Sequence, residues 1–254
     1  PGFIGIIIGI ILLNRLRDTP QSLGLPPVEK FRNDYHGGTE KGEEERELST
    51  KEILFEYVLN NKYIWVLAIS YFFVYIVRQA MNDWTMLFFT EHKGYTGMQA
   101  GGCVCWFEVG GFFGSFLAGW GSDYFFRGRR GPVNVFFSIG MALTVLALWF
   151  SPPQSVFLDS FIIFLIGFFV FGPQMLIGVA AAELSHKKAA ATATGFAGLF
   201  AYAGAAVAGA PLGYIIRDYG WENFFISVVA CGFIVVLLLL PIISAKVNPR
   251  YANK

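Results

Sequence analysis

Residues 156–182 read VFLDSFIIFLIGFFVFGPQMLIGVAAA, and this stretch decides the fold class. It is longer than the roughly 20 mostly apolar residues that an α-helix needs to cross a bilayer. Gly172 and Pro173 interrupt it, which a helix packed among membrane neighbours tolerates. Five similar stretches lie around it, at 63–89, 99–120, 133–150, 192–216 and 223–244. The sequence therefore predicts an all-α membrane protein with a bundle of six crossing helices.

The composition agrees with a membrane protein. Of the 254 residues 55% are hydrophobic, 17% aromatic and only 15% charged, whereas a typical soluble domain has about 25% charged residues. The net charge of +1 argues against a nucleic-acid partner, which would favour a basic surface. The three cysteines are too few for a disulfide framework.

Four regions follow one another along the chain. Residues 1–13 are apolar but too few to span a bilayer, and we expect them to be the end of a truncated helix. Residues 14–61 form a hydrophilic linker, in which the Ser49-Thr50-Lys51-Glu52 pattern predicts a helix start. Residues 62–245 hold the crossing helices, and residues 246–254 form a short tail.

The positive charges predict an orientation. Of the 19 Lys and Arg residues, all but three lie in the linker, the tail or alternate loops. Lys93 and Arg217 lie in the opposite loops, and Arg78 is inside a helix. By the positive-inside rule, the linker and the C-terminus are expected in the cytoplasm.

Arg78 is the first candidate for a binding role. It lies about 16 residues, or roughly 24 Å, along its helix and is still at membrane depth. An arginine there costs on the order of 2.5–3.5 kcal/mol, so it should face a partner or a water-filled cavity. Its planar fork suits phosphate, and a buried ion pair with Asp83 or Glu108 is the alternative.

The other polar residues near Arg78 have more than one interpretation. Asp83 and Glu108 could pair with a basic residue of another helix, which we favour, relay a proton, or be kept neutral by burial. Tyr71 and Tyr75 share a helical face with Arg78. Their hydroxyls could donate to an oxyanion, although aromatic packing explains them equally well.

The most specific local pattern is the loop GWGSDYFFRGRRG at residues 119–131. Its acid and three arginines, namely Asp123, Arg127, Arg129 and Arg130, can latch neighbouring helix ends. Alternatively, the arginines only mark the loop as cytoplasmic, since any cytoplasmic loop is rich in arginine. The Gly-Ser-Asp sequence at the start of the loop favours a role in holding the helix ends.

This loop resembles the signature loop of the major facilitator superfamily. Further segments resemble its organophosphate:phosphate antiporters, and the resemblance covers essentially the whole chain. These segments are RDTPQSLGLPP at 17–27, VYIVR at 74–78 with Asp83 and Trp84, FGPQMLIG at 171–178 and ELSHKK at 183–188.

The resemblance implies twelve helices in two halves, of which this chain would hold the end of helix six and helices seven to twelve. It implies that one arginine from each half grips phosphate, and Arg78 matches the arginine of the second half. Tyr75 and Tyr202 match positions in the substrate cavity. Asp83 and Glu108 match cavity positions or salt bridges between the halves. Phe171 departs from the tyrosine of the glycerol-3-phosphate carrier.

We therefore expect a transporter that exchanges a sugar phosphate, with glucose 6-phosphate favoured, for inorganic phosphate by alternating access. One alternative is a membrane sensor of hexose phosphate that signals to a partner kinase, and another is a glycerol-3-phosphate carrier. No pattern indicates an enzyme, a cofactor or a metal site. The expected partners are the lipid bilayer and an N-terminal half of the same chain, and the expected location is a bacterial inner membrane.

Overall fold

A computed structural model describes residues 2–17, 20–26, 31, 49–153 and 155–244. The chain divides into two units, residues 1–46 with 252–254, and residues 47–251. The first unit contains α1 (Gly2–Arg15), in which no residue is buried, and the short 3-10 helix η1 (Pro20–Leu23). The expected tail at 246–254 and most of the expected linker lie outside the described residues.

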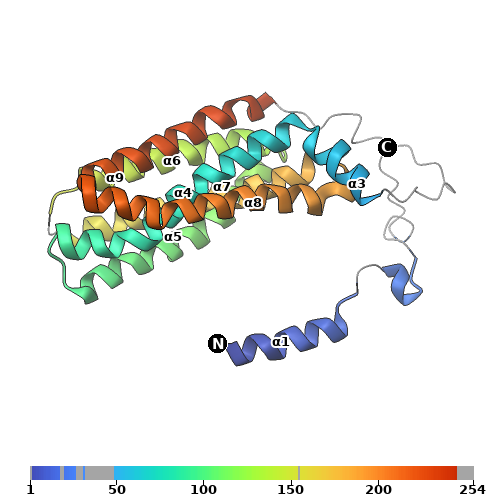
Figure 1. The fold of residues 1–254 in the computed structure, drawn as a ribbon, viewed down its shortest axis with the longest axis horizontal. Helices are drawn as coiled ribbons and strands as arrows, with labels where there is room; N and C mark the ends of the chain where they lie inside the picture. Colours follow the sequence, from blue (N-terminus) through green and yellow to red (C-terminus); the bar gives the residue numbers. More distant parts are fainter. Residues whose placement is uncertain (1, 18–19, 27–30, 32–48, 154, 245–254) are drawn as a thin grey trace. The chain divides into compact units, whose positions relative to one another are not determined.

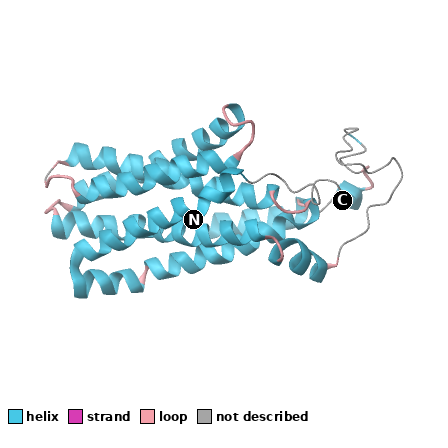
Figure 2. Cartoon of the chain, turned by 90° about the horizontal axis from the view of Figure 1, so that it is seen from above, coloured by secondary structure: helices cyan, strands magenta, loops and turns pink. Residues whose placement is uncertain are grey.

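The second unit is a bundle of long helices that run side by side, with the short loops at its two ends (Figures 1 and 2). The part of the chain that the structure describes contains no strand. The expectation of an all-α membrane protein is confirmed. The long helices are α4 (Lys62–Leu87), α5 (Gly97–Tyr124), α6 (Arg130–Trp149), α7 (Val156–Glu183), α8 (Ala190–Ala208) and α9 (Ala210–Leu239). Shorter helical segments adjoin them, namely α3 (Thr50–Glu52), η2 (Ile53–Leu59), η3 (Phe88–His92), η4 (Lys187–Ala189) and η5 (Leu240–Ser244).

Side-chain caps fix where several helices begin. The predicted start at Ser49 is confirmed, since α3 begins at Thr50 and the Ser49 amide donates to the Glu52 carboxylate. The Asn61 side chain accepts from the Tyr63 amide at the start of α4 and donates to the Leu184 carbonyl at 2.8 Å. Asn61 therefore caps one helix and holds the end of another.

Among the described residues, five helical stretches are long and apolar enough to cross a membrane, and the last of them, Ala190–Ile243, has 54 residues. Within it Gly220 adopts the left-handed φ of 81°, which glycine tolerates best. The chain turns back there, at the change from orange to red in Figure 1. Before the turn Gly213 contacts Trp84 of α4, and after it Gly232 contacts Ala142 of α6. This stretch is therefore long enough for the last two of the six expected crossings.

Small residues bring helix backbones close together. A methyl group added at Gly110 or Gly114 of α5 would overlap the backbone of Phe164 or Phe168 of α7. These contacts confirm the close approach that a pair of small residues four apart predicts. The same spacing at Gly209 and Gly213 predicts a second close approach, which is wrong in part: Gly213 lies against Trp84 of α4, but no neighbouring helix among the described residues approaches Gly209.

Gly209 instead interrupts the helix between α8 and α9. Its ψ of −110° is not helical, and Pro211 just beyond it has no amide hydrogen to donate. The indole nitrogen of Trp84 donates to the Ala208 carbonyl at 2.8 Å. The break is therefore held by a side chain of another helix.

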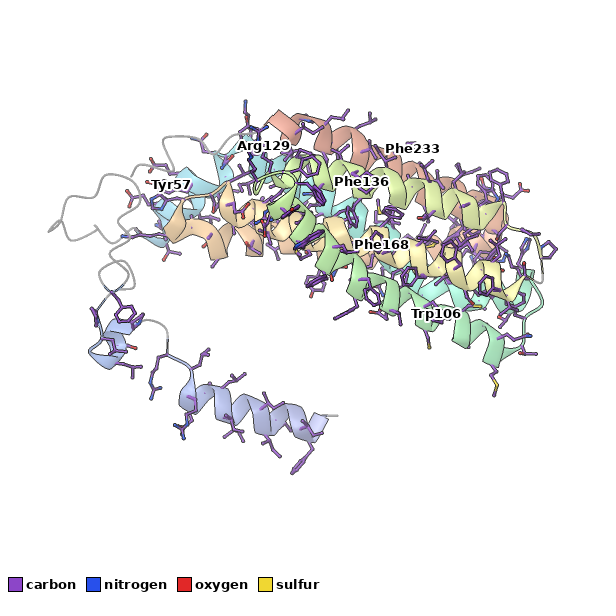
Figure 3. The ribbon with its side chains drawn as sticks, turned by 180° about the vertical axis from the view of Figure 1, so that it is seen from behind. Tyr57, Trp106, Arg129, Phe136, Phe168 and Phe233 are labelled. Carbon is purple, nitrogen blue, oxygen red and sulfur yellow. The ribbon has the colours of Figure 1, made fainter. Side chains whose placement is uncertain are left out.

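The outer surface of the bundle is apolar. Trp106, Phe136 and Phe233 project from it (Figure 3) and are each about half exposed or more. A soluble monomer rarely exposes so many large apolar side chains. Together with the long apolar helices, this surface is that of a multi-pass integral membrane protein.

Candidate functional site

Arg78 lies on α4 and its guanidinium is enclosed by rings. The Cζ atom lies 5.8 Å from the ring centroid of Tyr75, on the same helix, and 5.2 Å from that of Phe171 on α7. The side chain is half-buried, and its Nε atom is buried without a hydrogen-bond partner. Aromatic faces attract a cation at these distances, but they do not neutralise its charge.

The two acids expected near Arg78 do not pair with it. Asp83 is exposed and accepts hydrogen bonds from Gln79 at 2.8 Å and Asn82 at 3.0 Å, both on its own helix. Glu108 is exposed on α5. Within residues 49–153 and 155–244, Arg78 makes no ion pair and neither acid makes one with another helix. The pairing favoured from the sequence therefore stays a prediction, because the described residues include no partner for either acid.

The expected tyrosines form a chain of rings that leads to Arg78. The rings of Tyr71 and Tyr75 meet edge to face at 4.9 Å, and Tyr75 lies 5.9 Å from Tyr202 of α8. Tyr202 is 73% exposed. The structure therefore places Tyr75 beside the guanidinium and Tyr202 one ring further away.

A cleft of about 380 Å³ lies between α4, α5 and α7. This volume is within the range of small-molecule pockets. Phe171 joins the two features, because its ring faces the guanidinium and also lines the cleft. The lining residues are Tyr71, Ser115, Phe171, Gln174, Met175, Gly178 and Val179.

Arg130 holds one end of the bundle together. Its guanidinium binds Asp123 at the end of α5 at 2.6 Å and Glu183 at the end of α7 at 2.9 Å. Arg127 and Arg129 are exposed and make no ion pair within the described residues. Of the four residues expected to latch helix ends, and so to form a gating loop at residues 119–131, the structure brings together only Asp123 and Arg130. Glu183 was not expected in this cluster.

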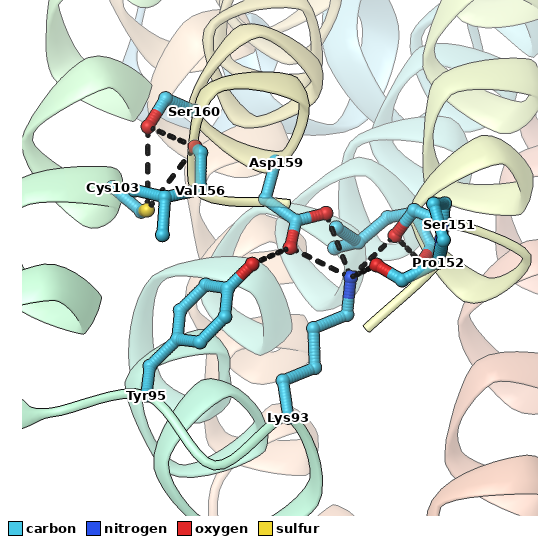
Figure 4. Close-up of polar contacts among 9 residues, drawn as sticks. Lys93, Tyr95, Cys103, Ser151, Pro152, Val156, Asp159 and Ser160 are labelled. Atoms are coloured by element: carbon cyan, nitrogen blue, oxygen red, sulfur yellow. Dashed lines mark hydrogen bonds and ion pairs between the residues drawn. The ribbon is translucent and has the colours of Figure 1, made fainter. Parts of the chain in front are cut away.

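The opposite end carries a buried charge cluster that sequence reasoning missed (Figure 4). The Lys93 ammonium lies 2.7 Å from both carboxylate oxygens of Asp159 and donates to the Ser151 hydroxyl at 2.6 Å. The Tyr95 hydroxyl donates to Asp159 at 2.6 Å. Burial, together with this hydrogen bond, raises the pKa of Tyr95 above its usual value. The cluster joins the loop after η3 to the start of α7.

Comparisons with known proteins identify the family of the chain. The family model described as Major Facilitator Superfamily matches residues 1–209. The chain is 55% identical over 255 residues to a "Probable hexose phosphate transport protein" of Chlamydia trachomatis, covering 97% of this chain and 56% of that protein. It is 49% identical to the "Membrane sensor protein UhpC" of Escherichia coli, covering 99% and 57%. It is 35% identical to the "Hexose-6-phosphate:phosphate antiporter" of Salmonella typhimurium, covering 97% and 54%. The chain thus spans about half the length of these relatives.

Proposed function

The chain belongs to the Major Facilitator Superfamily and fits its organophosphate:phosphate antiporters, and from this premise we propose that it is the second half of a sugar-phosphate carrier. The complete carrier exchanges a hexose phosphate, with glucose 6-phosphate as the favoured substrate, for inorganic phosphate. The observation that carries the proposal is the Arg78 guanidinium, which lies against Phe171 of the cleft lining, at membrane depth, with no acid paired to it among the described residues.

An unneutralised arginine at this depth needs an anion. Its cost of about 2.5–3.5 kcal/mol is offset when a phosphate dianion enters and accepts from its fork. The family resemblance implies that a second arginine, from the other half, binds the same anion. The anion would then be held between the two halves. The Tyr75 ring lies beside the Arg78 guanidinium, and the exposed Tyr202 ring lies next to the Tyr75 ring. No bond is broken, and the chemistry is electrostatic.

Alternating access requires each half to move largely as one body around this site. The Arg130 cluster ties the ends of α5 and α7 to the start of α6. The buried Lys93 cluster ties the α4–α5 connection to α7 at the other end. Asp83 and Glu108 are exposed on this half, and we propose that they pair across the interface between halves when the carrier closes.

The proposed location is a bacterial inner membrane, as the bacterial relatives suggest. The linker and the C-terminus lie on the cytoplasmic side, because the positive charges concentrate there. Residues 62–245 form helices seven to twelve, and the Arg130 cluster faces the cytoplasm.

A sensor is the second candidate, favoured by the 49% identity to a membrane sensor protein. A sensor uses the same grip on hexose phosphate, but its output is the state of a partner kinase. A glycerol-3-phosphate carrier is the third candidate. Proteoliposomes with the full-length protein separate the first two, since phosphate counterflow driven by glucose 6-phosphate requires a carrier, whereas binding without flux indicates a sensor.

Arg78→Lys tests the proposed site. The variant keeps the charge but loses the fork, so we expect phosphate and glucose 6-phosphate affinities to fall about 10- to 100-fold. Arg217→Lys is the matched control, because Arg217 is exposed and its contacts among the described residues, an ion pair with Asp218 and a cation–π contact with Tyr214, are local. Wild-type binding in Arg78→Lys would refute the assigned role.

A further inference from the structure

Gln174 is a polar residue in the cleft that the phosphate grip does not use. It lies on α7, one turn beyond Phe171, and lines the cleft. Its Oε1 atom is buried and has no hydrogen-bond partner. Buried amide oxygens are nearly always paired in native proteins, so this atom calls for a donor that the described residues do not supply.

The cleft lies at a suitable place for the rest of a phosphorylated ligand. Phe171 and Gln174 are three residues apart and therefore neighbours on one face of α7. Tyr71 lines the cleft, and Arg78 is seven residues further along α4, about 10 Å along the axis. A ligand with its phosphate at Arg78 would place its carbon skeleton past the Phe171 ring, toward Gln174.

The chemistry of the lining selects what can fill the cleft. Ser115 already donates its hydroxyl hydrogen to the Phe112 carbonyl at 3.0 Å, so its oxygen is left as an acceptor. The Gln174 oxygen is a second acceptor. Acceptors suit the hydroxyl groups of a sugar, whereas a phosphate dianion offers mainly acceptor oxygens of its own.

We propose that Gln174, with Ser115 and Tyr71, forms a subsite for the hydroxylated carbon skeleton of the organophosphate, which inorganic phosphate does not occupy. This proposal rests on the proposed function. Two residues of this half then bind different parts of the substrate. Arg78 binds the phosphate group, which both substrates contain, and Gln174 binds the hydroxyl groups, which only the organophosphate has.

Gln174→Met tests this subsite in the purified full-length protein, since methionine keeps the length of the side chain but cannot accept the hydroxyl hydrogen bond. We expect the Kd for glucose 6-phosphate to rise about 3- to 10-fold, the loss of one or two uncharged hydrogen bonds. The Kd for inorganic phosphate should not change. Gln99→Met makes the same change at an exposed residue near the start of α5 that does not line the cleft, so it is the matched control and should leave both Kd values unchanged.

A thermal readout separates binding from a structural role. The Gln174 oxygen has no partner in the described part of the chain, so Gln174→Met should not lower the melting temperature of the ligand-free protein. A lower melting temperature with equal weakening of both ligands would overturn the subsite, as would an unchanged Kd for glucose 6-phosphate. Failure of the wild-type protein to bind either ligand, or wild-type binding in Arg78→Lys, would instead overturn the proposed function itself.

Discussion

Lys93→Met should destabilise the protein more than any exposed ion-pair change. Asp159 has no exposed surface, and Lys93 reaches both of its carboxylate oxygens at 2.7 Å. Without the ammonium, the buried carboxylate keeps only the hydrogen bond from Tyr95. Removing one partner of a buried pair typically costs about 3–5 kcal/mol, because the other charge is left uncompensated.

The double variant Lys93→Met/Asp159→Leu makes the test specific. It removes both charges, and replacing a buried pair with apolar groups of similar size is often neutral or stabilising. We therefore expect it to recover most of the loss caused by Lys93→Met. The stability of both variants is measured by heating the full-length protein in detergent and recording how much of it remains monodisperse at each temperature.

An exposed pair provides the control. Arg217→Met breaks the contact with Asp218, in which the arginine side chain is 72% exposed, and should cost no more than about 1 kcal/mol. If Lys93→Met were no more harmful than Arg217→Met, or if the double variant lost as much as Lys93→Met, the account of the buried cluster would be wrong.

Two further predictions concern packing and pH. Gly114→Val would drive a side chain into the backbone of Phe168, so we expect the free energy of unfolding to fall by about 1–3 kcal/mol or more. Gly195→Val is the control, because its side chain meets open space and should cost less. The shift in melting temperature of the two variants compares them. The raised pKa of Tyr95 makes its contribution to stability complete below about pH 10, and this contribution is lost at higher pH as the unfolded chain deprotonates first. Melting temperatures of Tyr95→Phe from pH 9 to 11 should therefore fall less steeply than those of the wild type, and equal slopes would contradict this.

Most of the fold could be predicted because it follows from local properties. Apolar length marks each crossing, the Ser49 capping pattern marks a helix start, and the spacing of Gly110 and Gly114 marks a close contact. These signals lie within one helix. Proximity of Tyr75 to Arg78 is likewise given by helical periodicity, since the two residues are three positions apart.

Contacts between helices were harder to predict. Phe171 packs against Arg78, and Glu183 pairs with Arg130. The two residues of each pair lie far apart in the sequence, so no local pattern predicts these contacts. The sequence did indicate that Asp159 is unusual, because it is the only charged residue in residues 156–182. An acid at that place needs a partner, but only the fold identifies Lys93.

The break at Gly209 gives the bundle a preformed bending point. A regular helix bends sharply only by giving up bonds of its own ladder, yet here the ladder is already open and Trp84 holds the loose carbonyl of Ala208. Flexure of this segment would strain few bonds, among them the indole bond and the long bond from the Gly209 amide to the Ala206 carbonyl at 3.3 Å. Because that indole belongs to α4, the helix that carries Arg78, a swing at the break would pull on the helix at which we propose that the anion is held.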